Sequence, residues 1–266
     1  MIAAVRRHVR IIVHFWRASL MQAMSYRLSF ALGVFANACD FCFGLLQYGL
    51  FFTAANRLGG WDINTMLAFY AIFMTLFSLH FILLTPNLEG MGRLVNRGEL
   101  DLVLVRPVSA QALLSFRRIS FDDVGSVGTA LVLLSGLWLT GRIVVTPERV
   151  LAFLVAIGCS TALVYSLFLG LLALAIRLEK FENVGQLTWS FFTLARYPAD
   201  IFPRWLRGIF YAIVPIAFVT TVPARALTMG ERPEVIGLGV VLTLFFLAAA
   251  RGFWRSALAR YASAGG

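Results

Sequence analysis

Lysine, histidine, cysteine and acidic residues are all scarce in this chain of 266 residues. Lys180 is the single lysine among 23 basic residues, and there are only 13 acidic residues, three histidines and three cysteines. An ATP-hydrolysing phosphate loop needs the pattern Gly-x-x-x-x-Gly-Lys-Ser/Thr, but Lys180 follows Glu179, so the chain has no such loop. We therefore expect no catalytic residues and no ATP hydrolysis by this chain.

The few histidines and acids are also scattered, which argues against an intramembrane enzyme or a metal centre. Neither Gly-x-Ser-x-Gly nor His-Glu-x-x-His occurs. Cys39 and Cys42 lie three residues apart, but no second pair and no neighbouring histidine completes a metal site. We interpret them and Cys159 as small buried hydrophobic residues, and we expect no metal or cofactor on this chain.

Apolar residues, in contrast, are abundant. The chain is 60% hydrophobic with a mean hydropathy of +0.82, whereas soluble domains are about 45–50% apolar. Several runs approach the roughly 20 apolar residues that cross a bilayer. The net charge is +10, and the arginines cluster beside these runs, which indicates contact with lipid headgroups rather than nucleic acid. We expect a polytopic protein of a bacterial inner membrane.

The pattern predicts an all-α fold with six crossings. Residues 1–27 alternate apolar and basic positions in a helical period, so we expect an amphipathic helix lying in the membrane interface. Both ends of the chain are basic, so both termini are expected in the cytoplasm, which requires an even number of crossings. Residues 28–266 then form a single transmembrane domain, with spans at about 28–54, 64–84, 124–140, 150–176, 184–200 and 235–250.

Two topologies satisfy six crossings. In the first, 184–200 is the fifth span and 202–224 forms a re-entrant helix pair on the outer side. In the second, 177–208 stays cytoplasmic and 209–227 crosses. The arginines at 196, 204 and 207 favour the second topology on charge alone.

Residues 85–123 form the one long polar segment between apolar stretches. Within it, Gly98 allows a break, and acids at 99 and 101 would lie near the N-terminus of a short helix, where the helix dipole favours them. Pro107 ends this segment and holds Arg106 in an extended conformation. Leucines at 100, 102 and 104 alternate with other residues, so the segment predicts a stiff projection suited to a groove on a soluble partner.

Four features together resemble the permease subunits of ATP-binding-cassette type-2 transporters, in the branch of small six-span permeases without a fused ATPase domain. They are the basic amphipathic N-terminus, the stretch Arg97-Gly98-Glu99-Leu100-Asp101 closing on Arg106-Pro107-Val108, Tyr197-Pro198 followed by Phe202-Pro203, and Ile213-Val214-Pro215-Ile216-Ala217-Phe218 running into Val222-Pro223-Ala224. The resemblance covers essentially the whole chain.

The resemblance implies a subunit of an exporter that is driven by a separate ATPase dimer, which would bind ATP and Mg²⁺. It also implies a second permease, either the same or a homologous chain, and the first of the two topologies. The residues expected to couple to the ATPase are Arg97, Gly98, Glu99, Leu100, Asp101, Leu104, Arg106 and Pro107.

Residues of the substrate pathway or gate are expected in the membrane. They are Asp40, Phe191, Phe192, Arg196, Tyr197, Pro198 and Pro215. A carboxylate in mid-span costs about 2.5–3.5 kcal/mol on insertion scales, so Asp40 would bind a cationic substrate, pair with Arg196, or be protonated and hydrogen-bonded. We interpret His80 as a hydrogen-bonded packing residue. The alternative function is a secondary transporter driven by protons through Asp40 and His80.

Two pairs of closely spaced glycines, Gly125 with Gly128 and Gly237 with Gly239, permit another helix to approach closely. We expect a close helix contact at each pair.

Overall fold

The computed structural model describes residues 2–96, 100–105, 109–178, 184–212 and 215–260. The fold is all-helical, with 83% of residues in helices and no strand among the described residues. Four helices are long and apolar enough to cross a membrane. The expectation of a polytopic, all-α membrane protein is therefore confirmed at this level.

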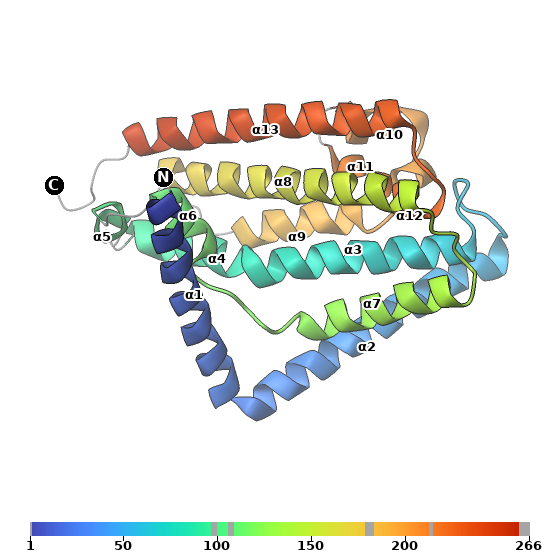
Figure 1. Ribbon diagram of the computed structural model, residues 1–266, viewed down its shortest axis with the longest axis horizontal. Helices are drawn as coiled ribbons and strands as arrows, with labels where there is room; N and C mark the ends of the chain where they lie inside the picture. Colours follow the sequence, from blue (N-terminus) through green and yellow to red (C-terminus); the bar gives the residue numbers. More distant parts are fainter. Residues whose placement is uncertain (1, 97–99, 106–108, 179–183, 213–214, 261–266) are drawn as a thin grey trace.

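Helices α1 (Ile2–Ser25) and α2 (Arg27–Ala54) form a V at one edge of the molecule (Figure 1). The two helices part at Tyr26, whose backbone angles are not helical. Trp16 of α1 donates a hydrogen bond from its ring nitrogen to the Phe116 carbonyl at 2.9 Å. Most of α2 is unburied, and Phe35 and Phe43 are among its exposed aromatic residues, so this helix offers an apolar surface to lipid or to another protein.

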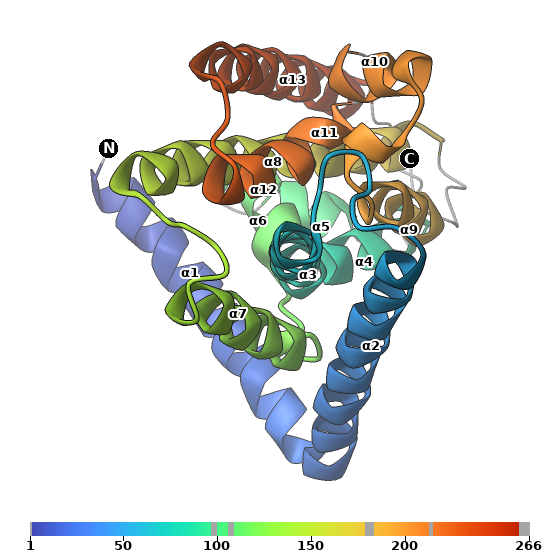
Figure 2. The ribbon, with the colours of Figure 1, turned by 90° about the vertical axis from the view of Figure 1, so that its right-hand side faces the viewer.

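Helix α3 (Ile63–Leu83) is the most buried of the long helices and lies near the centre of the bundle (Figure 2). It begins in a capping box, in which the Asp62 carboxylate accepts from the Thr65 backbone and Thr65 accepts from the Asp62 backbone. Around α3 lie α7 (Val124–Leu139), α8 (Pro147–Leu178) and α9 (Val184–Ala195). Helix α13 (Pro233–Ala259) packs along α8.

Short helices close both ends of the bundle. At one end, α4 (Thr85–Asn96), α5 (Leu100–Leu104) and α6 (Ala110–Phe116) form what we call the cap (Figure 1). At the opposite end, called the far end below, a second group of short elements is gathered. These are η1 (Ala199–Ile201), α10 (Arg204–Ala212), α11 (Ile216–Val219) and α12 (Thr221–Thr228).

The predicted segments occur as helices, with differences at their ends. The fifth predicted span, 184–200, is helical only to Ala195, because the chain then turns at Pro198 into η1. The last predicted span, 235–250, continues to Ala259, because Trp254 and Ala257 remain buried beyond the apolar run. Residues 209–227 form no single helix and are divided among α10, α11 and α12, in the part of this segment that is described.

The expectation of buried cysteines was wrong for Cys42, which is exposed on α2, while Cys39 and Cys159 are half-buried and none forms a disulfide. An apolar helix facing lipid has no need to bury its small residues in protein, so hydrophobicity alone did not distinguish the two environments.

One member of each glycine pair makes a close contact. A Cβ atom on Gly125 would lie 2.8 Å from Cγ1 of Val34 on α2, and one on Gly239 would lie 2.9 Å from the Phe218 ring. Gly128 and Gly237 have open space at the same position. Close packing within the subunit therefore explains Gly125 and Gly239 but not their partners.

Candidate functional site

The cap presents exposed apolar side chains at the end of the molecule. On α5, Leu100 and Val103 are buried, whereas Leu102 is 64% exposed and Val105, just after the helix, is 80% exposed. The helix therefore has one face packed inward and one face turned out of the bundle. Leu102 on α5 and Val105 just after it therefore present apolar surface at this end of the molecule that is available to another protein.

The predicted coupling residues fall into two groups. Arg97, Gly98, Glu99, Arg106 and Pro107 lie outside the described residues. The remaining three are described: Leu100 is fully buried and supports α5 from inside, Asp101 is partly exposed and interacts within the chain, and Leu104 is exposed. Val105 was missed, because a valine in a valine-leucine run carries no sequence signal of its exposure.

The cap is packed onto α8 and α13 through one hydrophobic cluster. Buried side chains of α5 and α6, among them Leu100 and Leu113, join Leu172 and Ile176 of α8 and Trp254 of α13 in this cluster. The cap and the two long helices therefore share one packed cluster, and close-packed side chains of this kind transmit strain.

Tyr165 of α8 strengthens this connection. Its hydroxyl accepts a hydrogen bond from Gln111 at 2.9 Å and pairs with the Ser115 hydroxyl at 3.2 Å, so it holds two side chains of α6. Its ring stacks on Phe116, with centroids 5.8 Å apart, and on Phe168, with centroids 6.3 Å apart. Tyr165 thus links α6 to the interior of the bundle.

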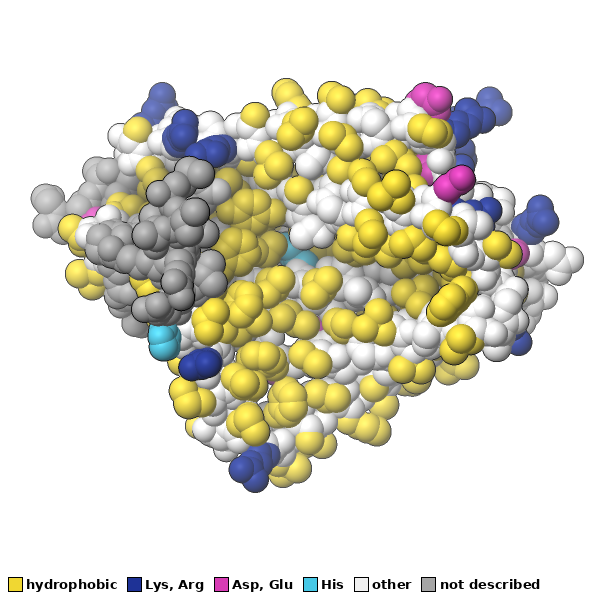
Figure 3. Space-filling model, viewed as in Figure 1, with side chains coloured by type: hydrophobic (Ala, Val, Ile, Leu, Met, Phe, Trp, Pro, Cys, Tyr) yellow, Lys and Arg dark blue, Asp and Glu magenta, His cyan; other side chains and the backbone are white. Residues whose placement is uncertain are grey.

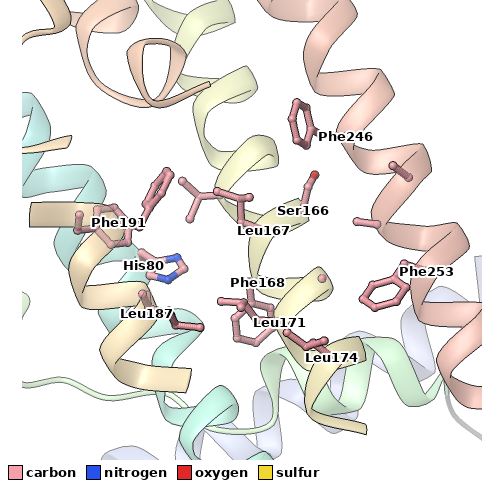
Figure 4. Close-up of a pocket in the computed structure, with 16 residues that line it drawn as sticks. His80, Ser166, Leu167, Phe168, Leu171, Leu174, Leu187, Phe191, Phe246 and Phe253 are labelled. Atoms are coloured by element: carbon pink, nitrogen blue, oxygen red, sulfur yellow. The ribbon is translucent and has the colours of Figure 1, made fainter. Parts of the chain in front are cut away.

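An apolar pocket lies between α3, α8, α9 and α13, next to this link (Figure 4). Its volume is about 520 Å³. Two of the predicted pathway residues, Phe191 and Phe192, line it together with Phe168. The space-filling view shows the face hollowed beside these helices and surrounded by hydrophobic side chains (Figure 3).

His80 is the polar residue of the pocket that sequence reasoning misjudged. It is 6% exposed and packs its ring against Phe192, with centroids 4.9 Å apart, and against Phe168. Neither ring nitrogen has a hydrogen-bond partner among the described residues. The expectation of a packing residue holds, but the expectation of a hydrogen-bonded one was wrong, because the described residues place aromatic rings beside the imidazole and no hydrogen-bond partner at either nitrogen.

Arg196, Tyr197 and Pro198 come together with α2 and α3 at the far end. The Tyr48 hydroxyl donates to the Arg196 carbonyl, and Gln47 donates to the Tyr197 hydroxyl at 3.2 Å. The Arg196 guanidinium lies 5.9 Å from the centroid of the Tyr70 ring, a cation–π geometry. The hydrogen bond from Tyr48 satisfies the backbone carbonyl of Arg196, just after the C-terminus of α9. Together, these contacts determine where that helix ends.

Asp200 organises a polar network that the sequence did not reveal. Its carboxylate accepts from the Trp61 ring nitrogen at 3.1 Å and pairs with Arg225 at 3.3 Å. Arg225 also forms an ion pair with Glu231 at 3.0 Å, and the Glu231 side chain is only 3% exposed. Arg207 donates to the Asp200 carbonyl at 2.8 Å. The network joins η1, α10, α12 and the loop before α13.

Pro215 starts α11, a short helix buried in the core. The elements around it are tied by two threonine side chains, since Thr220 donates to the Ala195 carbonyl and the Thr221 hydroxyl accepts from the Ala199 backbone. Pro215 therefore helps to shape the far end and does not line the pocket.

Asp40 is exposed on α2. Among the described residues it forms no ion pair with Arg196 and no hydrogen bond with His80, which is buried at the pocket. Its charge is one of those that act on Asp123, before α7: burial, together with the charges of Asp122 and Asp40, raises the pKa of Asp123 to about 6. The residues needed by a proton-driven mechanism are therefore not joined in this structure. No cluster of metal-ligating side chains occurs in the described part of the chain.

Comparison with known protein families gives a match over most of the chain. The sequence model of the family described as "ABC-2 family transporter protein" matches residues 41–265, which is most of the chain. Comparison with curated proteins gives no match.

Proposed function

The chain belongs to the ABC-2 family of transporter proteins, and from this premise we propose that it is the permease subunit of an ATP-driven exporter in an inner membrane. The chain itself does not hydrolyse ATP, since its sequence has no phosphate loop. ATP and Mg²⁺ bind to a separate ATPase dimer, and the cap is the part of the permease that meets it.

The observation that carries this proposal is the two-faced α5. Its outer face exposes Leu102 and Val105 at the end of the bundle, and its inner face buries Leu100 and Val103 in the cluster shared with α8 and α13. A partner that binds the outer face would move the inner face, and with it two long helices. Helix α5 is thus the coupling helix, and the cap end is the cytoplasmic end.

The topology we propose has six crossings, α2, α3, α7, α8, α9 and α13. Because α10, α11 and α12 lie at the far end, away from the cap (Figure 1), we place them as the re-entrant segment on the outer side. The first residues of α1 and the last of α13 lie at the cap end, in keeping with cytoplasmic termini. Helix α1 then lies in the inner interface.

A second permease, the same chain or a homologous one, completes the pathway. The support for this is the largely unburied apolar α2, together with the small number of helices available to enclose a conduit. The pathway residues of α9, Phe191 and Phe192, would then meet the cargo in the membrane.

The test compares two exposed apolar residues at opposite ends of the molecule. Leu102 on α5 is 64% exposed and Val144, in the loop before α8, is 63% exposed. The tagged chain is purified from its native host in mild detergent as wild type, Leu102→Asp and Val144→Asp, and the co-purified ATPase is quantified. We expect at least a tenfold loss of ATPase with Leu102→Asp and full recovery with Val144→Asp. Equal recovery from all three would refute the assignment of α5.

A further inference from the structure

The pocket has the dimensions and walls of a site for one hydrocarbon chain. Its volume of about 520 Å³ lies within the roughly 300–1,000 Å³ range of small-molecule sites. Along α8 it extends from Val164 to Leu174, which at 1.5 Å per residue corresponds to about 15 Å. The walls are phenylalanine and leucine side chains of α8, α9 and α13 (Figure 4). A linear apolar chain fits this shape.

The imidazole of His80 is a buried polar group of the pocket that lacks a hydrogen-bond partner among the described residues. The side chain is more than nine-tenths buried, and both ring nitrogens lack partners among the described residues. Two other polar side chains line the pocket, but Ser166 donates to the Ala162 carbonyl at 2.7 Å and Thr188 also interacts within the chain. A buried imidazole without hydrogen bonds is costly, and a bound oxygen group would satisfy it.

The polar group that fits beside His80 is uncharged. No Asp, Glu, Lys or Arg is among the residues that line the pocket in the described part of the chain. Burying a carboxylate, phosphate or ammonium there would be expensive without an opposite charge. A hydroxyl or an ester can use the donor and the acceptor that a neutral imidazole offers.

We infer that the pocket binds a neutral, single-chain lipid as transported cargo, with its hydrocarbon chain against the phenylalanines and its hydroxyl or ester oxygen hydrogen-bonded to His80. As a statement about cargo, this rests on the proposed function.

Contacts between the pocket and the cap favour cargo over a permanently bound lipid. The Phe168 ring contacts His80, with centroids 6.4 Å apart, and stacks on Tyr165, which holds α6. Phe168 and Ala250 line the pocket and also belong to the cluster that includes Leu100 of α5. Movement of the cap therefore changes the pocket walls, which suits a ligand that must be released.

Two glycines of α8 allow a matched test of occupancy. Gly170 lines the pocket and Gly158 does not, and a Cβ atom at either position meets open space. The full chain in phosphatidylcholine nanodiscs is exposed to a monoacylglycerol that carries a diazirine in its chain. After photolysis, labelled peptides are quantified by mass spectrometry. We expect labelling within 164–174 and 187–192, reduced at least fivefold by Gly170→Leu and unchanged by Gly158→Leu. Equal labelling of the two variants would show that the probe does not bind in this pocket.

Competition tests the role of His80. Unlabelled monoacylglycerol and an alkane of the same chain length are compared as competitors of the probe. In the wild type the monoacylglycerol should compete at least tenfold better, and in His80→Leu this preference should disappear while labelling persists. A preference that survives in His80→Leu would show that His80 is only a packing residue.

ATPase measurements on the co-purified complex separate cargo from resident lipid. If the lipid is cargo, monoacylglycerol stimulates ATP hydrolysis by the wild type and by Gly158→Leu but not by Gly170→Leu, each compared with its own rate without lipid. Labelling without stimulation would overturn the cargo assignment while leaving the exporter proposal intact. Failure of any ATPase to co-purify would instead overturn the exporter proposal, and the labelling result would still stand for the chain alone.

Discussion

At the scale of single residues, the structure separates side chains that look alike in the sequence. Gly125 and Gly128 lie on one helix three positions apart, yet only Gly125 faces Val34 of α2. Asp62 and Asp123 both precede helices, yet only Asp62 caps one with its side chain. These differences can be measured with simple pairs of substitutions.

Gly125→Ala should destabilise the protein and Gly128→Ala should not. The new methyl group at 125 would lie 2.8 Å from the Val34 side chain and 3.0 Å from its carbonyl oxygen, and overpacking of this kind costs about 1–3 kcal/mol. At 128 the methyl group meets open space. Thermal unfolding in one detergent compares the two; equal melting temperatures would mean that α2 and α7 are not in contact as described.

Asp123→Asn and Asp62→Ala should change stability with opposite pH dependence. Burial, with the charges of Asp122 and Asp40, raises the pKa of Asp123 to about 6, so the folded protein loses stability as pH rises from about 4 to above 6. Asp123→Asn should therefore raise the melting temperature near pH 8 and leave it unchanged near pH 4.

Asp62 behaves in the opposite way. Burial alone would raise its pKa, but hydrogen bonds from Thr65 outweigh burial and hold the pKa below its ordinary value. Its contribution is therefore present at neutral pH and is lost as pH falls through the lowered pKa. Asp62→Ala should cost about 1 kcal/mol at pH 7, as for other helix caps, and little at low pH. The same trend in both variants would contradict the assigned environments.

At the scale of elements, the far end depends on ion pairs between segments distant in sequence. Asp200 of η1 and Glu231, before α13, both pair with Arg225 of α12. These side chains connect η1, α12 and the loop before α13 to one another at the far end.

Arg225→Ala should destabilise the protein by about 2 kcal/mol. Removing one partner of a fully buried ion pair costs about 3–5 kcal/mol. The expected cost is smaller here because the Arg225 side chain is 33% exposed. Arg232→Ala is the matched control, since Arg232 is exposed and its side chain forms no ion pair with described residues. A double-mutant cycle with Asp200→Asn should show coupling; strict additivity would argue against the ion pair.

The sequence predicted the long elements well and the connections between them poorly. Runs of apolar residues fix the extent of α2, α3 and α8, because crossing a bilayer requires length. The end of α9 at Ala195 depends on hydrogen bonds from Tyr48 and Thr220, and such distant partners have no local signature. The lack of hydrogen-bond partners at the His80 imidazole likewise results from tertiary packing. Val105 is exposed only because α5 turns its other face inward.

At the scale of the whole molecule, the two ends differ in what they can bind. The cap end carries exposed leucine and valine side chains on α5 and just after it, and the far end carries partly buried ion pairs and exposed residues such as Trp205. In the proposed six-crossing topology, these surfaces face opposite sides of the membrane.

Single cysteines at these two places should be labelled from opposite sides. In a background without the three native cysteines, Trp205→Cys on α10 should react with an impermeant thiol reagent in intact cells. Val105→Cys, at a residue 80% exposed beside the cap, should react only after the membrane is opened. Labelling of Trp205→Cys solely after opening would place 202–224 on the inner side and restore the second topology.

The packing of α13 on α8 has a consequence for how the protein is made. The two helices are separated by more than fifty residues of chain, and α13 is synthesised after every other helix described. Until α13 enters the membrane, the faces of α8 that it covers are exposed to lipid and the pocket lacks one wall. The nascent protein therefore passes through an inserted but incompletely assembled stage, in which α8 packs against α4, α11 and α12 but lacks α13.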